Sequence, residues 1–425
     1  MTYRIAGIDV HKKMLAVAVA DVAGGGEFEF ERLTFSTTPE PLKAMAQWFM
    51  EHGVQEAVME STAQYWKPVW EALERYWQPA CQKQADANPM TGSLHLAQAQ
   101  SNRARRGRKN DFGDAERLVR RYVAQELVLS FVPSTEQRLW RTVTRQKQQR
   151  VVARVRLQNQ MEALLEEAHI KLSSLVSDLL GQSGRRMLEA LAEGKTDPAE
   201  IALLADRKLR ATQAQLCDAL GAARELNPVY RKLLQQGLAE LRLLEEQIQE
   251  LDQEIARLLA AHHDAVQKLA EVPGLGPDSA QQIIAEVWPT AAVFPTAKNL
   301  ASWVGVCPGD DISAGESHST RSPKGNRNMR RILNQAAHAA VKAKGSIFEL
   351  LFQRFRRALS YKEAIWAIAH RLCRLIWVIL SRKVRYQERG PAVSAASTRL
   401  RASRMMRELR RMGYRVDPPS EFQNA

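Results

Sequence analysis

The chain has 425 residues, which is more than one ordinary domain needs and suggests two or three. Hydrophobic residues make up 45% of it, a proportion typical of a folded globular protein rather than a disordered one. Lys and Arg number 61 against 47 Asp and Glu, which gives a net charge of +14. Such a surplus excludes a generally acidic surface and favours a polyanionic partner, with nucleic acid ahead of an anionic membrane.

The chain contains no run of about 18 uninterrupted apolar residues. The most apolar segment, residues 364–380, carries His370, Arg371 and Arg374, so we interpret it as a buried or partner-facing helix and expect no membrane partner. No secretory signal is visible before the first strand pattern. The cysteines are far apart and form no CxxC pair, so we expect neither a zinc site nor a disulfide framework, and a cytoplasmic, nucleoid-associated location. They are Cys81, Cys217, Cys307 and Cys373.

Residues 1–132 predict a mixed α/β sheet. Runs rich in β-branched and aromatic residues alternate with segments of helical spacing. Three consecutive strands followed by alternating helix and strand are typical of such a sheet. The expected strands are 3–10, 14–20, 27–35 and 55–60, and the expected helices are 39–52 and 65–76.

Residues 133–266 predict a helical connector. A basic helix is expected over 136–168, and a later segment carries leucines and isoleucines at heptad spacing, which favours a coiled coil that self-associates. The breaks within 181–227 would also allow the two helices to pair as antiparallel arms, and an ordinary core helix is a further alternative. The heptad positions are Leu234, Leu241, Leu244, Ile248, Leu251, Ile255 and Leu258.

Residues 267–390 predict a second, helical domain, and residues 391–425 a basic tail. The segment VPGLGPDSA (272–280) has the form of a helix-hairpin-helix turn. Its backbone amides, at Gly274 and Gly276, would bind a DNA phosphate without reading the base sequence. A plain turn between helices is the alternative.

Four carboxylates form the first candidate site. Asp9 ends the first strand in GIDVHK, Glu60 ends the fourth, and Asp111 and Asp114 lie three residues apart where a helix begins. Four carboxylates in one cleft would repel each other without a cation. Mg²⁺ prefers such oxygen ligands, and two ions about 4 Å apart would suit phosphoryl transfer.

The same residues also admit simpler interpretations. Asp9 and Glu60 could merely end strands, and Asp111 could cap a helix with Asp114 on its first turn. A basic run directly before Asp111 would hold a phosphate backbone beside a metal site, or would otherwise be a solvated loop. Its residues are Arg103, Arg105, Arg106, Arg108 and Lys109.

A glycine-rich loop spanning 304–326 precedes a basic helix and forms the second candidate site. Glycines let a backbone approach a phosphate, and a helix N-terminus attracts anions. A serine here could attack a phosphodiester if its proton is removed. The candidates are Ser313, Ser317, Ser319 and Ser322, with His318 as a possible base. The basic residues expected to contact nucleic acid are Arg321, Lys324, Arg327, Arg330 and Arg331.

Together these motifs resemble a known family. GIDVHK, the acidic strand end at Glu60, KxDxxDA and the loop GxxPGxxxSAG followed by KGNxxxRRxL occur in the order found in the DEDD transposases of bacterial insertion sequences. Members of that family are bridge-RNA-guided recombinases. The resemblance covers roughly residues 3–385. This chain has Ser313-Ala314-Gly315 where many members have Ser-Gly, which keeps Ser317 as an alternative to Ser313.

The resemblance implies an RNase H-like (RuvC-like) first domain, a coiled-coil connector and a helical serine domain. It implies that Asp9, Glu60, Asp111 and Asp114 bind Mg²⁺, and that Ser313 becomes covalently bonded to DNA. It implies donor and target DNA and a structured guide RNA as partners. It also implies a homo-oligomer, dimer or tetramer, in which the acidic site of one protomer is completed by the serine of another.

Three competing functions remain at this point. A metal-dependent endonuclease acting on DNA junctions would use the carboxylates without any serine. A basic coiled-coil protein with a degenerate site would bind nucleic acid without catalysis. An actin-like ATPase would share the GIDVHK strand but needs a second glycine-rich phosphate loop, which the sequence does not contain.

Overall fold

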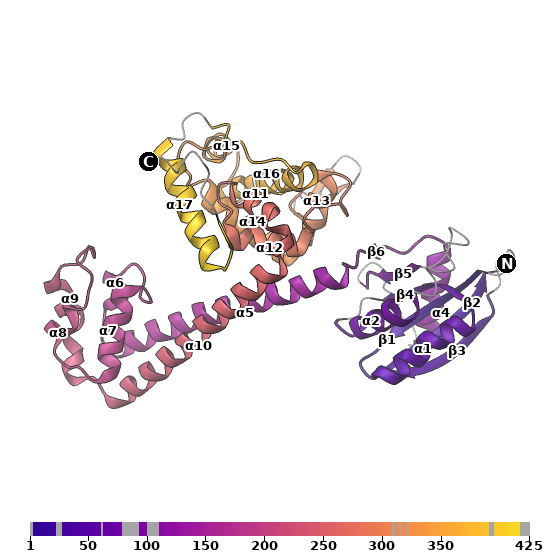
Figure 1. Cartoon of the computed structure of the whole chain (residues 1–425), viewed down its shortest axis with the longest axis horizontal. Helices are drawn as coiled ribbons and strands as arrows, with labels where there is room; N and C mark the ends of the chain where they lie inside the picture. Colours follow the sequence, from indigo (N-terminus) through magenta and orange to yellow (C-terminus); the bar gives the residue numbers. More distant parts are fainter. Residues whose placement is uncertain are drawn as a thin grey trace. The chain divides into compact units, whose positions relative to one another are not determined.

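The computed structural model describes residues 3–22, 28–60, 63–78, 93–99, 110–307, 311–313, 316–319, 322–390 and 395–416. The chain divides into two compact units, Met1–Pro133 and Ser134–Ala425. The first holds a six-stranded mixed sheet and the second is almost entirely helical (Figure 1). The predicted fold class is therefore confirmed.

The sheet of the first unit has the strand order β3-β2-β1-β4-β5-β6. β1 pairs antiparallel with β2 and parallel with β4, and β4 pairs parallel with β5. The strands are β1 (Tyr3–Val10), β2 (Met14–Val22), β3 (Phe30–Ser36), β4 (Val54–Glu60), β5 (Ser93–Ala97) and β6 (Leu129–Ser130). The helices are α1 (Pro39–Glu51), α2 (Trp66–Tyr76) and α4 (Asp111–Val123). β5 and β6 were not predicted.

Alternation along β1 directs its side chains to two different layers. Ala6, Ile8 and Val10 pack in the core beneath α1 and α2, whereas Ile5 packs with Val119 of α4 on the opposite face. Residues 7 and 9 therefore also belong to the α4 face of the sheet.

Gly7 explains how closely α4 approaches the sheet. A Cβ atom built at this position would lie 2.1 Å from the carbonyl oxygen of Ala115, closer than real Cβ contacts. Any side chain here would push α4 outward. The glycine of GIDVHK thus sets the distance between β1 and the helix that carries Asp111 and Asp114.

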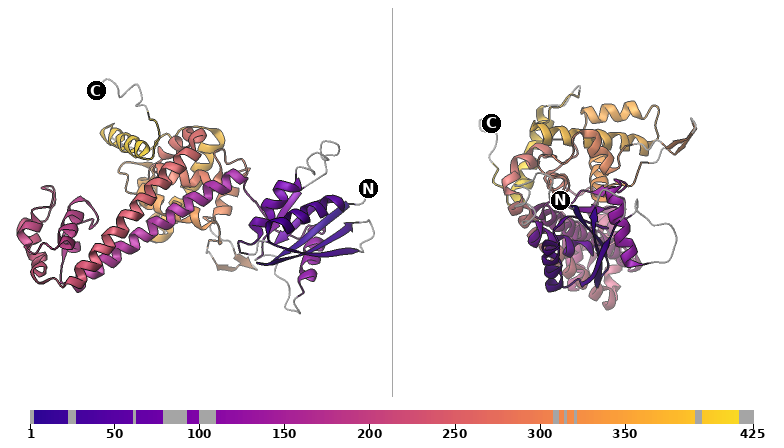
Figure 2. Two further views of the ribbon diagram at one scale, coloured as in Figure 1. Left: turned by 60° about the horizontal axis from the view of Figure 1, so that its bottom comes forward. Right: turned by 90° about the vertical axis from the view of Figure 1, so that its right-hand side faces the viewer.

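Two long helices form the arms of the second unit, α5 (Thr135–Glu167) and α10 (Pro228–Leu258). Figures 1 and 2 show them side by side. Ion pairs between Arg154 and Glu245, 3.3 Å apart, and between Lys147 and Asp252 give an antiparallel register. The heptad leucines of α10 therefore pack within one chain. Those near residues 248 and 251 are only partly buried.

One end of the arms carries a small helical core made by residues 170–226. Its apolar residues, such as Leu172, Met187 and Leu191, pack against Leu157 and Leu238 of the arms. The short elements here are α6 (Leu172–Leu175), α7 (Gln182–Glu193), α8 (Pro198–Ala202), α9 (Gln213–Ala219) and η1 (Gly221–Glu225).

The other end of the arms joins a larger core centred on α16 (Tyr361–Arg382). Among the described residues, only α16 has the length and apolar composition of a membrane span, but half of that apolar stretch is buried in this core. The other elements are η2 (Ala260–His262), α11 (His263–Ala270), α12 (Pro277–Val287), α13 (Ala297–Val304), β7 (Asp311–Ser313), β8 (Glu316–Ser319), α14 (Arg327–Ala340), α15 (Ile347–Phe355) and α17 (Ala395–Arg411).

The segment predicted as a basic tail contributes to this core. Leu409, Met412, Tyr414 and Val416 are all buried in it. The arginines that dominate the composition of residues 391–425 concealed this apolar spacing.

Candidate acidic active site and serine loop

Asp9 and Glu60 lie at the carboxyl ends of neighbouring parallel strands. The register pairs Ile8 with Met59, so the next residue along each strand is one of the two carboxylates. Both belong to the α4 face, since Val58, two residues before Glu60, packs against Leu118 of α4. The strand register thus places the two strand ends side by side, as the sequence predicted.

The first turn of α4 carries the other two carboxylates, Asp111 and Asp114. The side chain of His11 connects this turn to β1: its Nε2 lies 3.1 Å from Oδ2 of Asp9 and 3.3 Å from Oδ1 of Asp111. Asp9, His11 and Asp111 each offer one ligand atom, and these three atoms all lie within 4.8 Å of one another. The structure therefore brings together ligands from two separate segments of the chain.

The charges in this site are mutually unfavourable. Burial raises the pKa of Asp9 above its ordinary value, and the nearby carboxylates of Asp114 and Asp111 raise it further, while His11 lowers it. Burial and the charge of Asp9 likewise raise the pKa of Glu60. The four predicted carboxylates thus affect one another electrostatically, and a bound cation would relieve this repulsion.

Arg117 is a further member of the site that the sequence did not reveal. It forms an ion pair with Asp114 one turn earlier on α4, and its charge also lowers the pKa of Glu60. Arg117 therefore offsets part of the negative charge of Asp114 and Glu60, whereas His11 lies near Asp9 and Asp111.

The donor set fits a divalent cation. Among the described residues, Nε2 of His11 is buried without a hydrogen-bond partner of acceptable geometry, although two carboxylate oxygens lie close to it. A nitrogen lone pair in that position is suited to a metal ion. The carboxylate oxygens are ligands of the kind that Mg²⁺ and Mn²⁺ take. Sequence reasoning placed His11 in a turn, although GIDVHK contains it two residues after Asp9.

The serine loop of the second unit is held at its base. A Cβ atom on Gly325 would lie 2.2 Å from the carbonyl oxygen of Val304, so the two ends of the loop meet through a glycine. Arg330 fastens the same place, because its guanidinium donates to the carbonyl oxygens of Gly305 and Pro323 and to Oγ of Ser322. Arg330, predicted to contact nucleic acid, thus makes contacts inside the protein.

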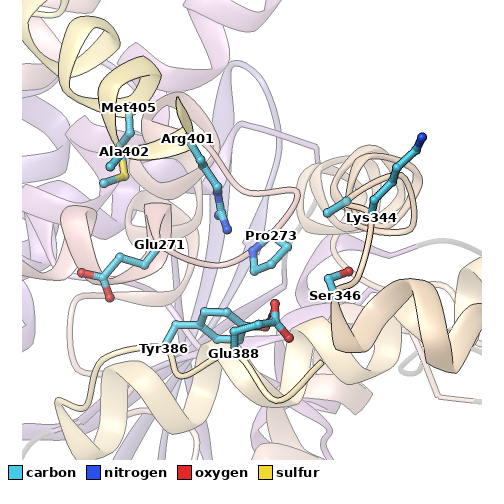
Figure 3. A pocket seen from close by; sticks show the side chains of 10 residues that line it. Glu271, Pro273, Lys344, Ser346, Tyr386, Glu388, Arg401, Ala402 and Met405 are labelled. Carbon is cyan, nitrogen blue, oxygen red and sulfur yellow. Dashed lines mark hydrogen bonds between the residues drawn. The ribbon is translucent and has the colours of Figure 1, made fainter. Parts of the chain in front are cut away.

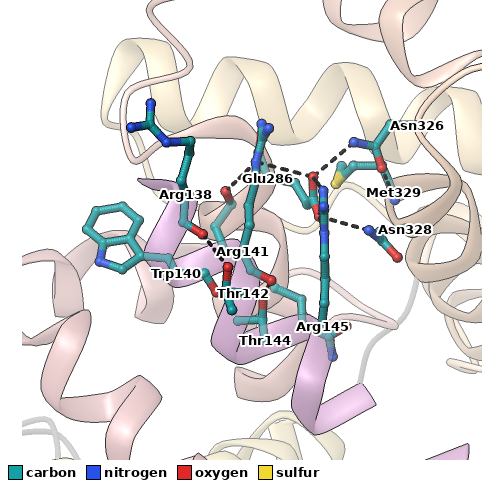
Figure 4. A network of polar contacts seen from close by, with 12 residues as sticks. Arg138, Trp140, Arg141, Thr142, Thr144, Arg145, Glu286, Asn326, Asn328 and Met329 are labelled. Carbon is teal, nitrogen blue, oxygen red and sulfur yellow. Dashed lines mark hydrogen bonds and ion pairs between the residues drawn. The ribbon is translucent and has the colours of Figure 1, made fainter. Parts of the chain in front are cut away.

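A buried carboxylate fixes the start of α14 after this loop (Figure 4). Glu286, only 2% exposed, accepts from Arg145 of α5 at 2.9 and 3.0 Å. It also accepts from Asn326 at 2.9 Å and Asn328 at 3.1 Å. Oδ1 of Asn326 in turn accepts from the backbone N–H of Met329 and caps the helix. The downstream end of the loop is therefore tied to α5 and α12.

The predicted nucleophile lies in a short hairpin within this loop. Ser313 ends β7, where its backbone pairs with Glu316 of β8, and Ser317 pairs with Ile312. Lys324 and Arg327 are exposed, and Arg331 donates to Gln282 at 2.5 Å. Arg321 lies outside the described residues, as does the predicted basic run Arg103, Arg105, Arg106, Arg108 and Lys109.

The two glycines of the predicted hairpin turn have packing roles. Gly274 has φ +86°, and a Cβ atom on it would lie 2.2 Å from the carbonyl oxygen of Ala336 in α14. A Cβ atom on Gly276 would lie 3.6 Å from the carboxylate of Glu408 in α17. Protein groups thus lie close to both glycines, and their contact with DNA stays a prediction.

Comparison with known proteins places the chain in a family. A DEDD transposase model of the IS110 type matches residues 6–170, and a model described as "Transposase IS116/IS110/IS902 family" matches residues 266–353. The chain belongs to the IS110 family of transposases. It is therefore an enzyme that cleaves and joins DNA, and the acidic site lies in its DEDD domain.

Relatives of this transposase are similar over different lengths. A probable family 20 transposase of Pseudomonas aeruginosa is 25% identical over 66% of this chain and 75% of the relative. An IS110 insertion-element protein of Streptomyces coelicolor is 27% identical over 36% of this chain and 38% of the relative. Among solved structures, Thermus thermophilus RuvC with a Holliday junction substrate aligns over 30% of this chain and 99% of its own, with 13% identity and a TM-score of 0.21.

Proposed function

We propose that this transposase cleaves and rejoins donor and target DNA through a covalent phosphoserine intermediate on Ser313, with divalent metal bound by the acidic quartet. The observation that carries the proposal is the convergence of Asp9, His11 and Asp111 in the DEDD domain of a transposase. Two Mg²⁺ ions would be held by Asp9, Glu60, Asp111 and Asp114, with His11 as a nitrogen donor. Bound metal would supply charge stabilisation to the phosphoryl oxygens.

In the proposed cleavage step, Oγ of Ser313 bonds to phosphorus while the bond from phosphorus to one sugar oxygen breaks. The serine proton ends on that departing oxygen. In the joining step a sugar hydroxyl attacks the phosphoserine and returns a proton to the serine. One phosphoester bond replaces another in each step, so neither needs an external energy source. The fastened base of the loop, at Gly325 and Arg330, would limit the orientations that the hairpin explores.

The proposal includes partners beyond DNA. A structured guide RNA would select both DNA partners by base pairing, so that the protein itself need not read their sequence. The active assembly would be a homo-oligomer in which the acidic site and the serine come from different protomers. The reaction acts on chromosomal DNA, which places it in the cytoplasm at the nucleoid. The net charge of +14 supports a polyanionic partner of this kind.

The decisive experiment separates covalent from hydrolytic chemistry. End-labelled donor DNA is incubated with wild-type protein and Mg²⁺, and the products are separated under denaturing conditions. We expect a protein–DNA adduct that is lost in Ser313→Ala and kept in the matched Ser317→Ala. If Ser313→Ala cuts and rejoins normally, the covalent proposal fails. Cutting without joining or adduct would instead favour the metal-dependent nuclease.

A mixing experiment tests the division of the site between protomers. Asp9→Asn and Ser313→Ala proteins are each expected to be inactive. Exchanged into mixed oligomers, they should regain part of the activity, because some sites then contain one intact acidic pocket and one intact serine. Persistent inactivity in oligomers shown to be mixed would contradict this arrangement.

A further inference from the structure

We propose that the exposed face of α17 is a binding surface for the phosphate backbone of duplex DNA. This inference rests on the proposed function only in taking DNA as the substrate. It assigns a contact surface to a segment that the matched family models do not cover, since they end at residue 353. Figures 1 and 2 show α17 on the outer side of the helices around α16.

One face of α17 attaches the helix firmly to the body of the second unit. Leu409 is 1% exposed and Met405 and Met406 pack against the same core, which also buries Met412 and Tyr414 just after the helix. The helix therefore has a defined position on the domain, unlike a free basic tail.

The opposite face consists largely of arginine. At 100° per residue, five exposed arginines fall within an arc of about 140° and extend along about 18 Å of helix. Duplex DNA carries one phosphate per strand about every 3.4 Å, so a row of this length matches roughly five phosphates of one strand. These residues are Arg399, Arg404, Arg407, Arg410 and Arg411.

Little of the positive charge of this face is neutralised by the residues that the structure describes, although Arg411 lies near enough to Glu408 to lower the pKa of that carboxyl. Among the residues that the structure describes, none of the five arginines forms an ion pair. Two exposed arginines elsewhere in the same unit do: Arg242 pairs with Glu189 at 2.9 Å, and Arg257 with Glu254 at 2.6 Å. Because like charges repel, an unpaired row of arginines destabilises the folded protein more than a paired row does. A bound polyanion would relieve this repulsion.

Two charged residues of α17, Arg401 and Glu408, are partly buried toward the body of the domain. Arg401 points toward Pro273 in a pocket of about 320 Å³ beneath the helix (Figure 3), and it donates to the carbonyl oxygen of Ala270 at 3.3 Å. Glu408, the only acidic residue of α17, is half-buried next to Gly276, and burial raises its pKa while the charge of Arg411 lowers it. Glu408 thus borders the arginine face beside Arg411, and the rest of the face carries no carboxylate of this helix.

Duplex DNA fits this face better than single-stranded nucleic acid. Proteins that bind single strands stack bases on aromatic side chains, and α17 contains no aromatic residue. A straight row of guanidinium groups on a rigid helix contacts phosphates and carries no base-reading element. The surface would thus hold DNA of any sequence, while the choice of site lies elsewhere.

The test compares two double variants of the full-length protein that lose the same charge. Arg404→Gln with Arg407→Gln removes two arginines of the α17 face, and Arg242→Gln with Arg257→Gln removes two paired ones. The affinity for a fluorescein-labelled 20-base-pair duplex is measured by anisotropy over a range of salt concentrations. Each lost phosphate contact should reduce the slope of log K against log salt by about 0.9, so we expect a loss of about 1.8 and at least tenfold weaker binding near 100 mM salt for the α17 pair only.

All four substituted side chains are exposed, so both variants should fold like wild type. Thermal melting checks this. Equal slopes for the α17 variant and wild type would overturn the inference, as would a change confined to a single-stranded RNA of the same length. Cleavage at saturating DNA is measured in parallel. If the α17 variant cleaves DNA normally and its binding is unchanged, the α17 surface is rejected and the proposed reaction stands. If its binding is weaker but the protein, wild type included, never cleaves DNA, the proposed reaction is rejected and the surface stands.

Discussion

Replacing Gly7 by alanine tests whether the spacing of β1 and α4 builds the acidic site. The new Cβ would lie 2.1 Å from the carbonyl oxygen of Ala115, and a tolerable contact needs at least 3.0 Å, so α4 must move outward by about 0.9 Å. Overpacking of this kind costs about 1–3 kcal/mol, which should lower the melting temperature of the first unit by about 3–10 °C. The same shift carries Asp111 and Asp114 away from Asp9. A displacement near 1 Å can reduce catalysis by about 10²-fold.

The Gly7→Ala protein is tested in two assays. One measures its melting temperature with and without Mg²⁺, and the other measures its rate of DNA cleavage. Gly113→Ala is the matched stability control, because it lies on α4 between the same two aspartates. Its Cβ would meet only Asn110, at 3.5 Å, and alanine should stabilise the helix by up to about 1 kcal/mol. A Gly7→Ala protein that melts and cleaves like wild type would refute the reasoning about this close approach.

Three further predictions follow from the contacts of named residues. Without metal, Asp9 and Glu60 have raised pKa values; folding stability should therefore fall as pH rises from their unfolded pKa values through the raised folded ones. Asp9→Asn should melt higher than wild type in EDTA, by a margin that grows over this pH range, and should lose stabilisation by Mg²⁺; a margin that shrinks would contradict the sign. Glu286→Ala should lower the free energy of unfolding measured in urea by about 3 kcal/mol, because it leaves partly buried arginines without their carboxylate partner. Stability equal to wild type would show that this network does not stabilise the fold. Ile248→Asp with Leu251→Asp should lower the stability of the arms; unchanged melting would mean that neither residue contributes to their packing.

Much of the first unit could be predicted because its strands are strongly patterned. The two strands joined at His11, the helices at 39–51 and 66–76, and the carboxylates at strand ends all follow local signals. β5 was missed because its alternating segment, SLHLA, is only five residues long and its partner β4 is distant in sequence. The roles of Arg117 and of Nε2 of His11 could not be predicted, because they depend on how α4 docks on the sheet.

In the second unit, heptad spacing indicated a coiled coil but left open whether it pairs with another chain or with the helix at 136–168. Contacts such as Arg154 with Glu245, which join residues 91 positions apart in the sequence, give the antiparallel pairing within the chain. Glu286 gave no signal either, because its role depends on partners from α5 and from the start of α14 that are distant in sequence. The C-terminal segment shows the opposite problem, because its many arginines concealed Leu409 and Tyr414 as core residues.

The length of the antiparallel arms also sets how far the small helical core lies from the large one. α10 has 31 residues, which at 1.5 Å each makes a rod about 46 Å long that packs into the small helical core through Leu234 to Leu244 and into the large core through Ile255 and Ala256. A tilt of about 5° at one end would displace the other by about 4 Å. Inserting seven residues into each arm should preserve the facing seam and lengthen the rod by about 10 Å. The reach of the small core from the serine domain is thus set by helix length alone and can be changed in discrete steps.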